Sequence, residues 1–538
     1  TSKNANKYPS REVTVAASVS EEPSSDKSRA SGTYSASFEV LIKEALATSV
    51  SSVTEEELGR FKYLSMRKGE AGWMITYSFE NPIVAAEQGQ DADINVVVCQ
   101  EALDIQDIAA LPQLEYLNLD HTELPEGSLE TLSSLKMITC DYIQLDMLRL
   151  ALGDAAKGLE RLNASHLKSL EELSYFPGLK SLEMEDCREI SDISALAKVK
   201  DLENLKLYDM DEVNDFTVLN VLKKLRSLSI DAENLKDISF INHMPELASL
   251  GITDSKILLL DPLVGKESLK ELVLVDNGEV RDYNPVGTLT GLETLVINKY
   301  TSQEDPDLTA LTGLKHGEFH GMMGIRFLGS LTGLEELKVQ GCNVDQPSVI
   351  ASLPALKKLT YRKNWGNSDD LSFLAGCQGL TCLDMNHSEF YGDVSYAFNL
   401  PALETLILDS SSFEVKFDRL QDNPALKALS LNHVKLYKNI EMWSDGMVRS
   451  INYDDVLLDE YTSFLGHYPW LEYLSLRGNQ LTDLQFAAGL KNLRELDVTD
   501  NYVTDTHVLD QLEDLGKDST VKRPMADVDW IDTVEDSH

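Results

Sequence analysis

A short apolar phrase recurs along most of this chain and limits the folds that the chain can adopt. The phrase is an apolar residue, two variable residues, a second apolar residue, one variable residue and a third apolar residue. Between Leu179 and Leu292 its copies follow one another every 22 or 23 residues. Iteration at such a period indicates an array of similar structural units. Clear copies begin at Leu114, Leu179, Leu202, Leu225, Leu247, Leu269, Leu292, Leu334, Leu356, Leu380, Leu403, Leu426, Leu471 and Leu493.

The period also predicts where less regular copies lie. The gaps in the clear series contain LKMITC at Leu135, LERLNA at Leu159, LKHGEF at Leu314 and VRSINY at Val448. INVVVC at Ile94 adds one more, so we expect about 19 copies. Within a copy, the alternation of apolar and variable positions predicts a strand with one buried face. Because one copy cannot bury that face alone, the copies must stack to form a core.

Copies such as LKSLEMEDCREISDISALAKVKDL resemble the leucine-rich repeat, whose pattern is LxxLxLxxN, and in particular its internalin-like subclass of about 22 residues. The resemblance covers about residues 94–510. It implies an α/β solenoid, a right-handed leucine-rich-repeat horseshoe. Each copy would give one strand of a parallel concave β-sheet and one short helical or irregular convex segment.

The last position of the family pattern is an Asn whose side chain satisfies loop backbone groups. In this chain the position holds Asn277, Asn364, Asn479 and Asn501, and elsewhere Thr122, Cys187, Ser255, Cys342, Ser388 or Ser411. Hydroxyl and thiol groups can replace the amide in part, because they also form hydrogen bonds. We therefore interpret Cys187 and Cys342 as structural rather than reactive.

The two ends of the chain differ from the repeats. Residues 1–35 are rich in Ser, Lys and Glu and predict a disordered tether. Residues 36–93 predict an N-terminal cap with an inserted segment, including a helix over Phe38–Leu46 and a first strand from Phe61. The repeats follow over 94–507, and 508–538 predict a closing helix over Val508–Asp518 and an acidic tail. Caps are expected because a solenoid otherwise exposes its terminal core layers.

Composition excludes some classes of partner. The formal net charge of −41 should repel phosphate backbones and anionic membrane surfaces, so nucleic acid is not an expected partner. No apolar run approaches the roughly 20 residues that cross a bilayer, so we expect no transmembrane segment. The six cysteines have no paired spacing and predict neither a zinc site nor a disulfide framework.

The sequence predicts no catalytic, cofactor or metal site. It lacks HExxH, GxSxG and Walker patterns, and the glycines of Gly321–Gly329 do not lie between a strand and a helix. His316 and His320 fall on one face of one predicted strand, together with Glu318. The two histidines would be about 14 Å apart, too far for one zinc ion. We expect solvated side chains there.

Stacked strands place their outward residues on a grid that can be read from the sequence. On this grid Val273, Val275 and Val296 form an apolar lane with Gly251 on an otherwise polar concave face. Apolar groups within a polar rim are typical of protein-contact hot spots. β-branched residues also favour strands without any such role. Both interpretations of the lane stay open.

A small basic group lies beside this lane. The grid places each of its members near an acidic residue, in the pairs Lys338 with Glu318, Lys358 with Glu336 and Arg362 with Asp384. Exposed pairs contribute about 0–1 kcal/mol each, and we interpret the group as an ion-pair lattice rather than an anion-binding site. Trp365 should lie at the rim just past a strand. The candidate contacts for a protein ligand are Val273, Val275, Val296, His316, His320, Lys338, Lys358, Arg362 and Trp365.

These observations predict a non-enzymatic binding protein, secreted or tethered to the cell surface, that recognises a protein or glycan through its concave face as a monomer. The chain starts at Thr1 without a charged-then-apolar leader and resembles a processed or trimmed product. A tether over residues 1–35 suits a protein held away from a cell surface, so we expect the chain outside the cell or attached to its envelope. The alternative is an intracellular regulatory scaffold that docks on a partner enzyme. A hydrolase is a third interpretation, although fold alone implies no chemistry.

Overall fold

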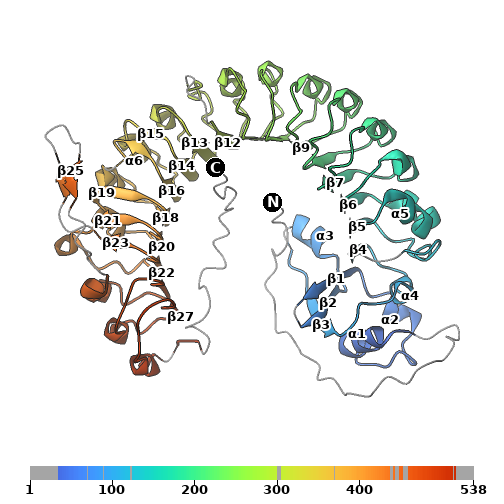
Figure 1. The fold of residues 1–538 in the computed structure, drawn as a ribbon, viewed down its shortest axis with the longest axis horizontal. Coiled ribbons are helices and arrows are strands. Elements are labelled where there is room, and N and C mark those ends of the chain that lie inside the picture. Colours follow the sequence, from blue (N-terminus) through green and yellow to red (C-terminus); the bar gives the residue numbers. More distant parts are fainter. Residues whose placement is uncertain are drawn as a thin grey trace. The chain divides into compact units, whose positions relative to one another are not determined.

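The structure is a computed structural model that describes residues 34–516 except 70, 89, 121–123, 300–304, 369, 437–439, 443–447, 452–457 and 513. Nearly all of the expected tether, the acidic tail and Thr122 therefore lie outside the described residues. The chain divides into two compact units, Thr1–Ile257 and Leu258–His538, called the first unit and the second unit below. In each unit, parallel strands line one side and short helical turns line the other (Figure 1).

An N-terminal cap of helices and antiparallel strands begins the first unit. The helices are α1 (Ala36–Leu46), α2 (Glu55–Leu58), α3 (Pro82–Glu87) and α4 (Ile105–Ala109). The strands are β1 (Tyr63–Gly69), β2 (Gly72–Ser78) and β3 (Asn95–Cys99), and β2 pairs antiparallel with both others. Helix α1 starts after Ser35, whose side chain accepts a hydrogen bond from the backbone N–H of Phe38. The predicted helix over Phe38–Leu46 and the predicted insertion before Ile94 are confirmed.

The repeat copy predicted at Ile94 is wrong. Its residues form β3, which is antiparallel to β2, whereas the parallel ladder runs from β1 to β4. Alternating apolar residues predict a half-buried strand, but the alternation is the same in antiparallel and parallel strands. The pattern could therefore locate this strand but not its direction.

The parallel strands of the first unit pair one to one with their neighbours, from β4 to β10. Each begins two residues after the first apolar residue of its copy. These strands are β4 (Tyr116–Asp120), β5 (Met137–Asp141), β6 (Arg161–Ser165), β7 (Ser181–Glu185), β8 (Asn204–Leu207), β9 (Ser227–Asp231) and β10 (Ser249–Thr253). The opposite side carries α5 (Leu145–Leu152), η1 (Gly153–Gly158), η2 (Glu171–Tyr175), η3 (Ser194–Lys198), η4 (Thr217–Val221) and η5 (Ser239–His243).

The second unit repeats this plan with a longer ladder. Its parallel strands are β11 (Glu271–Val275), β12 (Thr294–Asn298), β13 (His316–His320), β14 (Glu336–Gln340), β16 (Lys358–Arg362), β18 (Cys382–Asp384), β20 (Thr405–Ile407), β22 (Ala428–Ser430), β26 (Tyr473–Ser475) and β27 (Glu495–Asp497). Small side sheets join β15 (Asn343–Val344) with β17 (Trp365–Gly366), and β19 (Glu389–Asp393) with β21 (Ser412–Glu414) and β23 (Lys435–Leu436).

Short helical turns cover the other side of the second unit. They are η6 (Asp261–Leu263), η7 (Asn284–Thr288), η8 (Arg326–Ser330), α6 (Ser348–Ala351), η9 (Leu371–Gly376), α7 (Ser395–Phe398), η10 (Phe417–Arg419), η11 (Leu458–His467), η12 (Gln485–Gly489) and η13 (His507–Gln511). The closing helix predicted over Val508–Asp518 is, within the described residues, the single 3-10 turn η13.

The repeat copy predicted at Val448 is also wrong. Strand β25 (Val448–Ile451) pairs antiparallel with β24 (Ile440–Met442), and β22 pairs directly with β26. The segment between β22 and β26 is therefore an excursion from the ladder rather than one more layer of it. Its apolar residues imitate the repeat phrase because a hairpin strand has the same alternation.

The core of each unit is a ladder of the three apolar positions. In one copy of the first unit, Leu179, Leu182 and Met184 are each at most 1% exposed. In the second unit Leu356, Leu359 and Tyr361 are similarly buried. Burying one such side chain stabilises the fold by about 1.5–3 kcal/mol. Stacking of consecutive copies is therefore the main source of stability, as the alternation predicts.

Polar groups at the last position of the family pattern bind the loops together. The Asn364 amide accepts a hydrogen bond from Cys342 N and donates one to Val339 O, both at 3.0 Å. The Cys342 thiol donates to Phe319 O at 3.2 Å, and burial raises its pKa to about 12. The structural interpretation of Cys342 is confirmed, because its thiol takes the place of an amide.

The eighth position of the repeat has left-handed backbone in most copies. The residues with positive φ there are Tyr142, His166, Asp186, Asp209, Asp254, Asp276, Gly321, Gly341, Lys363, His387, Ser410, His433, Gly478 and Asp500. Gly, Asp and His tolerate this conformation better than most residues. The left-handed backbone therefore accounts for several charged residues at the edge of the sheet, and no ligand is needed to explain them.

Aspartates also serve the helical turns. The Asp192 carboxylate accepts a hydrogen bond from Ser194 N at 2.7 Å, and Asp215 accepts one from Thr217 N at 2.9 Å. Hydrogen bonds from Ser194 and Thr217 lower the pKa of the two carboxyl groups. Part of the acidic excess of the chain is thus explained by local backbone geometry.

Candidate functional site

Two of the predicted valines face each other on neighbouring strands of the second unit. Val273 on β11 is in register with Val296 on β12, and both are partly exposed. Val275 ends β11 with similar exposure. We call these three residues the valine strip. Gly251, the fourth residue of the predicted lane, belongs to the first unit.

Next to the valine strip, a clamped carboxylate lies on β13. Glu318 is in register with Val296 on one side and Lys338 on the other. Its Oε1 accepts a hydrogen bond from Lys338 Nζ at 2.8 Å and lies 2.6 Å from His320 Nε2. Burial acts to raise the pKa of Glu318, but the hydrogen bonds and positive charges of His320 and Lys338 outweigh it and hold the pKa at about 2. Glu318 is therefore a stable anion at neutral pH.

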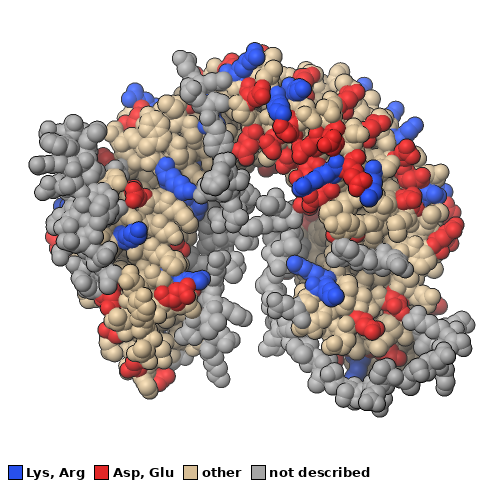
Figure 2. All heavy atoms as spheres, in the orientation of Figure 1, with Lys and Arg blue, Asp and Glu red and all other residues tan. Residues whose placement is uncertain are grey.

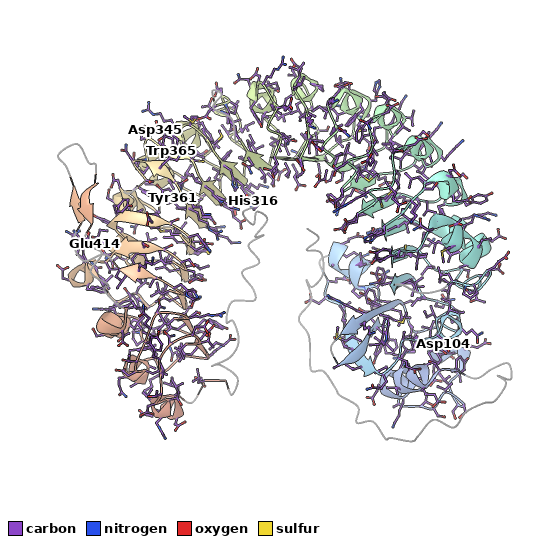
Figure 3. The ribbon with its side chains drawn as sticks, in the orientation of Figure 1. Asp104, His316, Asp345, Tyr361, Trp365 and Glu414 are labelled. Atoms are coloured by element: carbon purple, nitrogen blue, oxygen red, sulfur yellow. The ribbon has the colours of Figure 1, made fainter. Side chains whose placement is uncertain are left out.

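A second clamp of the same kind lies on β14. Glu336 is bound by Lys358 Nζ at 2.6 Å and lies 3.2 Å from His316 Nδ1. Burial acts to raise the pKa of Glu336, but the hydrogen bonds and charges of Lys358 and His316 lower it by more, so this pKa is lowered overall. His316 points from the strand side of the second unit (Figure 3). The side chains of His316 and Lys358 remain 48% and 47% exposed, so this clamp is the more accessible of the two.

The third predicted pair is more buried than expected. The Arg362 guanidinium donates to both carboxylate oxygens of Asp384, whose side chain is only 1% exposed. The prediction of exposed pairs is therefore wrong for Arg362, because Asp384 lies on the short strand β18 against the core. Lys338 is also mostly buried, with 15% of its side chain exposed. The predicted ion-pair lattice itself is confirmed in all three pairs.

The expectation that the side chains of HGEFH are solvated is wrong for His320. This residue is only 6% exposed. Asn298 and Gln340 flank it in register on the two adjacent strands, and Glu318 contacts its ring. Grid position alone cannot predict this burial, because it depends on the length of the neighbouring side chains.

The first unit carries an acidic edge that sequence reasoning did not single out. It consists of Glu185, Asp186, Asp209, Asp231 and Asp254, called the acidic rim, and Figure 2 shows acidic side chains gathered in this part of the surface. Burial, with the charges of Asp209, Asp254 and Asp211, raises the pKa of Asp231 to about 7. The signal was present in the sequence, since acidic residues recur at the seventh or eighth position of consecutive copies.

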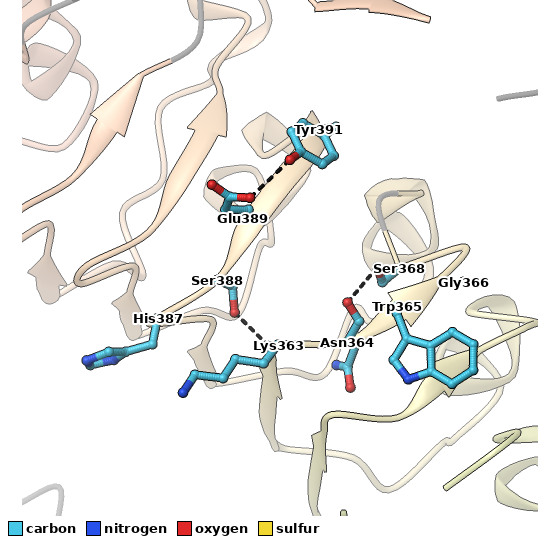
Figure 4. A pocket seen from close by; sticks show the side chains of 9 residues that line it. All are labelled: Lys363, Asn364, Trp365, Gly366, Ser368, His387, Ser388, Glu389 and Tyr391. Carbon is cyan, nitrogen blue, oxygen red and sulfur yellow. Dashed lines mark hydrogen bonds between the residues drawn. The ribbon is translucent and has the colours of Figure 1, made fainter. Parts of the chain in front are cut away.

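A hollow lies at the edge of the second unit beside Trp365 (Figures 3 and 4). Its volume is about 460 Å³, and the indole-bearing residue is 47% exposed. Trp365 lies just past β16, as predicted, where it begins the two-residue strand β17. The hollow is lined by Lys363, Asn364, Trp365, Gly366, Ser368, His387, Ser388, Glu389 and Tyr391. We call it the Trp365 hollow.

Two further properties of the described residues bear on function. No group of three or more His, Cys, Asp or Glu side chains in that part of the chain is arranged to hold a metal ion. None of the helices described there is both long and apolar enough to cross a membrane.

Comparison with known proteins places the repeats in a family context. Residues 469–513 match the family model described as Leucine Rich repeats (2 copies). No curated protein matches the chain significantly. Among solved structures, an internalin, InlF, from Listeria monocytogenes is 22% identical over 68% of this chain and 87% of its own, with a TM-score of 0.40. A leucine-rich-repeat protein of Leptospira interrogans is 14% identical over 73% and 92%, with a TM-score of 0.43.

A third similar structure is that of the Toll–Spatzle complex from Drosophila. It is 14% identical over 82% of this chain and 62% of that chain, with a TM-score of 0.46. Likenesses at these identities carry no information about the ligand of the present chain. The valine strip, the ion-pair lattice and the Trp365 hollow must be interpreted from their own chemistry.

Proposed function

Because this chain is a leucine-rich-repeat protein, we propose that it is a non-enzymatic binding protein that recognises a protein partner through the strand face of its second unit. The observation that carries the proposal is the valine strip beside the ion-pair lattice. Protein contacts depend on apolar anchors surrounded by polar groups that exclude water. The strip supplies the anchors, and the clamped Glu318 and Glu336 supply an ordered polar border.

Charge indicates which partner suits this face. The chain has a formal net charge of −41, and Glu271 on β11 is exposed beside the strip. Complementary potentials accelerate association and disfavour like-charged partners. The proposed partner is therefore a protein with apolar side chains set in a basic surface. Its association rate with this chain should fall as salt concentration rises.

The first experiment tests the valine strip. Proteins cross-linked to the chain in extracts or on the surfaces of cells would be identified, purified and titrated against it. We expect Val273→Asp with Val296→Asp to weaken binding of the true partner by at least about tenfold, since charged groups would enter an apolar contact. A matched control is Leu259→Asp with Val264→Asp, two residues that are 55% and 58% exposed outside the strip. Equal affinity of the strip variant and the control would contradict the proposal.

We place this activity outside the cell or on its envelope, since a binding surface without catalytic groups suits recognition of external proteins. Labelling of intact cells with an antibody against the folded chain tests this location. Staining that requires permeabilised cells would instead support an intracellular scaffold that docks on an enzyme.

A further inference from the structure

The Trp365 hollow results from a break between two side sheets. The main strands β16 and β18 are paired, but the segments that follow them join different sheets, β17 with β15 and β19 with β21. The hollow of about 460 Å³ lies between these two side sheets, because residues of both β17 and β19 line it. Small-molecule pockets in proteins have volumes of roughly 300–1,000 Å³. The hollow is therefore large enough for a ligand of a few rings.

The shape of the hollow depends on a glycine. Gly366 has a φ of +80°, and a Cβ added there would lie 2.2 Å from Asn343 Oδ1. Asn343 is held in turn, because its side-chain amide donates to Met323 O at 3.0 Å. A larger residue at position 366 would have to displace the Asn343 side chain and adopt a positive φ, so this backbone conformation requires glycine.

The lining combines an aromatic surface with groups that both donate and accept hydrogen bonds. Trp365 presents its indole ring on one side of the hollow (Figure 4). Glu389 lies on the opposite strand, oriented by the Tyr391 hydroxyl, which donates to its carboxylate at 3.0 Å. Lys363 and His387 extend together away from the indole, from two successive left-handed positions (Figure 4). The hollow thus has a flat apolar surface at one end and, away from it, an acceptor and two nitrogen donors.

The charges of the lining are balanced. One carboxylate, Glu389, and one ammonium, Lys363, share the hollow, which therefore favours neither an anion nor a cation. A neutral ligand with an apolar ring face and hydroxyl groups around its edge matches the lining best. The ring face would stack on the indole, while the hydroxyls would exchange hydrogen bonds with the polar residues.

We propose that the Trp365 hollow binds a neutral saccharide. This site is separate from the valine strip and does not rest on the protein-binding function proposed above. A cationic side chain of a protein is the competing ligand, because Trp, Tyr and a carboxylate can also hold a cation. The ammonium of Lys363 in the same hollow disfavours that ligand.

The test is binding of the folded chain to an array of immobilised neutral oligosaccharides, built from hexoses and N-acetylhexosamines. Any hit would be measured by calorimetric titration. We expect Trp365→Ala to raise the dissociation constant at least about tenfold and Trp365→Phe to stay within about threefold, because Phe retains a stacking ring. Tyr502→Ala is the matched control, since Tyr502 is a 68% exposed aromatic residue elsewhere in the second unit. Thermal melting confirms that each variant is folded.

A second arm separates the two ligand classes. Glu389→Gln keeps a hydrogen-bonding group and removes the charge, so it should reduce saccharide affinity less than Trp365→Ala does. It should abolish binding of a cationic ligand, for which a lysine-rich peptide is the probe. The proposal is overturned if the wild type binds none of the neutral oligosaccharides, if Trp365→Ala leaves their affinity unchanged, or if the lysine-rich peptide binds and is lost in both Trp365→Ala and Glu389→Gln. Failure of the valine-strip experiment would leave these outcomes untouched.

Discussion

The carboxylates of the acidic rim in the first unit lie at the seventh and eighth repeat positions, and those of the ion-pair lattice in the second unit lie at the third and fifth, with opposite electrostatic results. In the rim, neighbouring carboxylates and burial raise the pKa of Asp231 to about 7. In the lattice, a histidine and a lysine on adjacent positions hold the pKa of Glu318 at about 2. The same ladder geometry brings side chains of consecutive copies together in both cases. The charge of the residue in the neighbouring copy therefore decides whether the ionised form of a carboxyl group is stabilised or destabilised.

The comparison also separates backbone requirements from binding chemistry. Asp186, Asp209 and Asp254 occupy left-handed positions where Asp is tolerated for conformational reasons. These three carboxylates of the rim are thus explained without a ligand, whereas Glu185 and Asp231 end strands β7 and β9. Glu318 and Glu336 lie within strands, where no such requirement exists, and their partners are supplied by neighbouring copies. The lattice is for this reason the better candidate for a surface geometry that serves binding around the valine strip.

The largest effect should come from breaking the most buried pair of the lattice. Arg362→Ala leaves the carboxylate of Asp384, 1% exposed, without its guanidinium partner. Removing one partner of a buried ion pair typically destabilises by about 3–5 kcal/mol. Urea denaturation followed by circular dichroism measures the change. Arg326→Ala, which breaks a pair in which the Arg326 side chain is 73% exposed, should cost less than about 1 kcal/mol. Similar losses in both variants would show that burial does not distinguish these pairs.

An intermediate effect is expected at Glu318. Glu318→Gln should destabilise the chain by about 2 kcal/mol at pH 7, because the anion clamped by His320 and Lys338 is lost. A carboxyl group whose pKa is lower in the folded state than in the unfolded chain stabilises the fold at pH values above its unfolded pKa, which is about 4.3 for Glu. That stabilisation is lost as the pH falls toward the folded pKa of Glu318, about 2. The difference between wild type and variant should therefore shrink between pH 5 and pH 2. Urea midpoints measured across this range test the sign, and a constant difference would refute the clamp.

The smallest effect, with the opposite sign, is expected in the acidic rim. The folded pKa of Asp231 is about 7, above the unfolded value of about 3.9, so the folded state keeps its proton longer and stability falls as pH rises from 4 to 7. Asp231→Asn removes this penalty and should stabilise the chain by about 1 kcal/mol at pH 8, with no gain at pH 4. Thermal melting at both pH values measures it. Destabilisation at pH 8 would mean that Asp231 is paired rather than repelled.

Much of the ladder could be predicted from the leucines alone. The copy that begins at Leu356 places Leu359 and Tyr361 in the core and Asn364 in the loop, and the structure agrees. The period predicts a repeat copy wrongly where a strand has the same alternation but pairs antiparallel outside the ladder, as β3 and β25 do. Alternation reports which face is buried, while strand direction depends on contacts that are distant in sequence.

The candidate site was less predictable than the fold. The ion pairs of Lys338, Lys358 and Arg362 followed from register, because partners on adjacent strands lie at a fixed spacing. Their burial did not follow, since it depends on strand length and neighbouring side chains. The Trp365 hollow could not be predicted either, because it arises where two side sheets part, and no period in the sequence encodes that break.

The direct pairing of β22 with β26 has a practical consequence. The chain leaves the ladder after Ser430 and rejoins it at Tyr473 in correct register, so the stack tolerates a long detour at this point. Natural tolerance of this kind marks a site where engineers can fuse a fluorescent reporter or an affinity tag. A fusion within the β24–β25 hairpin would make the protein traceable in cells while leaving the valine strip and the Trp365 hollow unaltered.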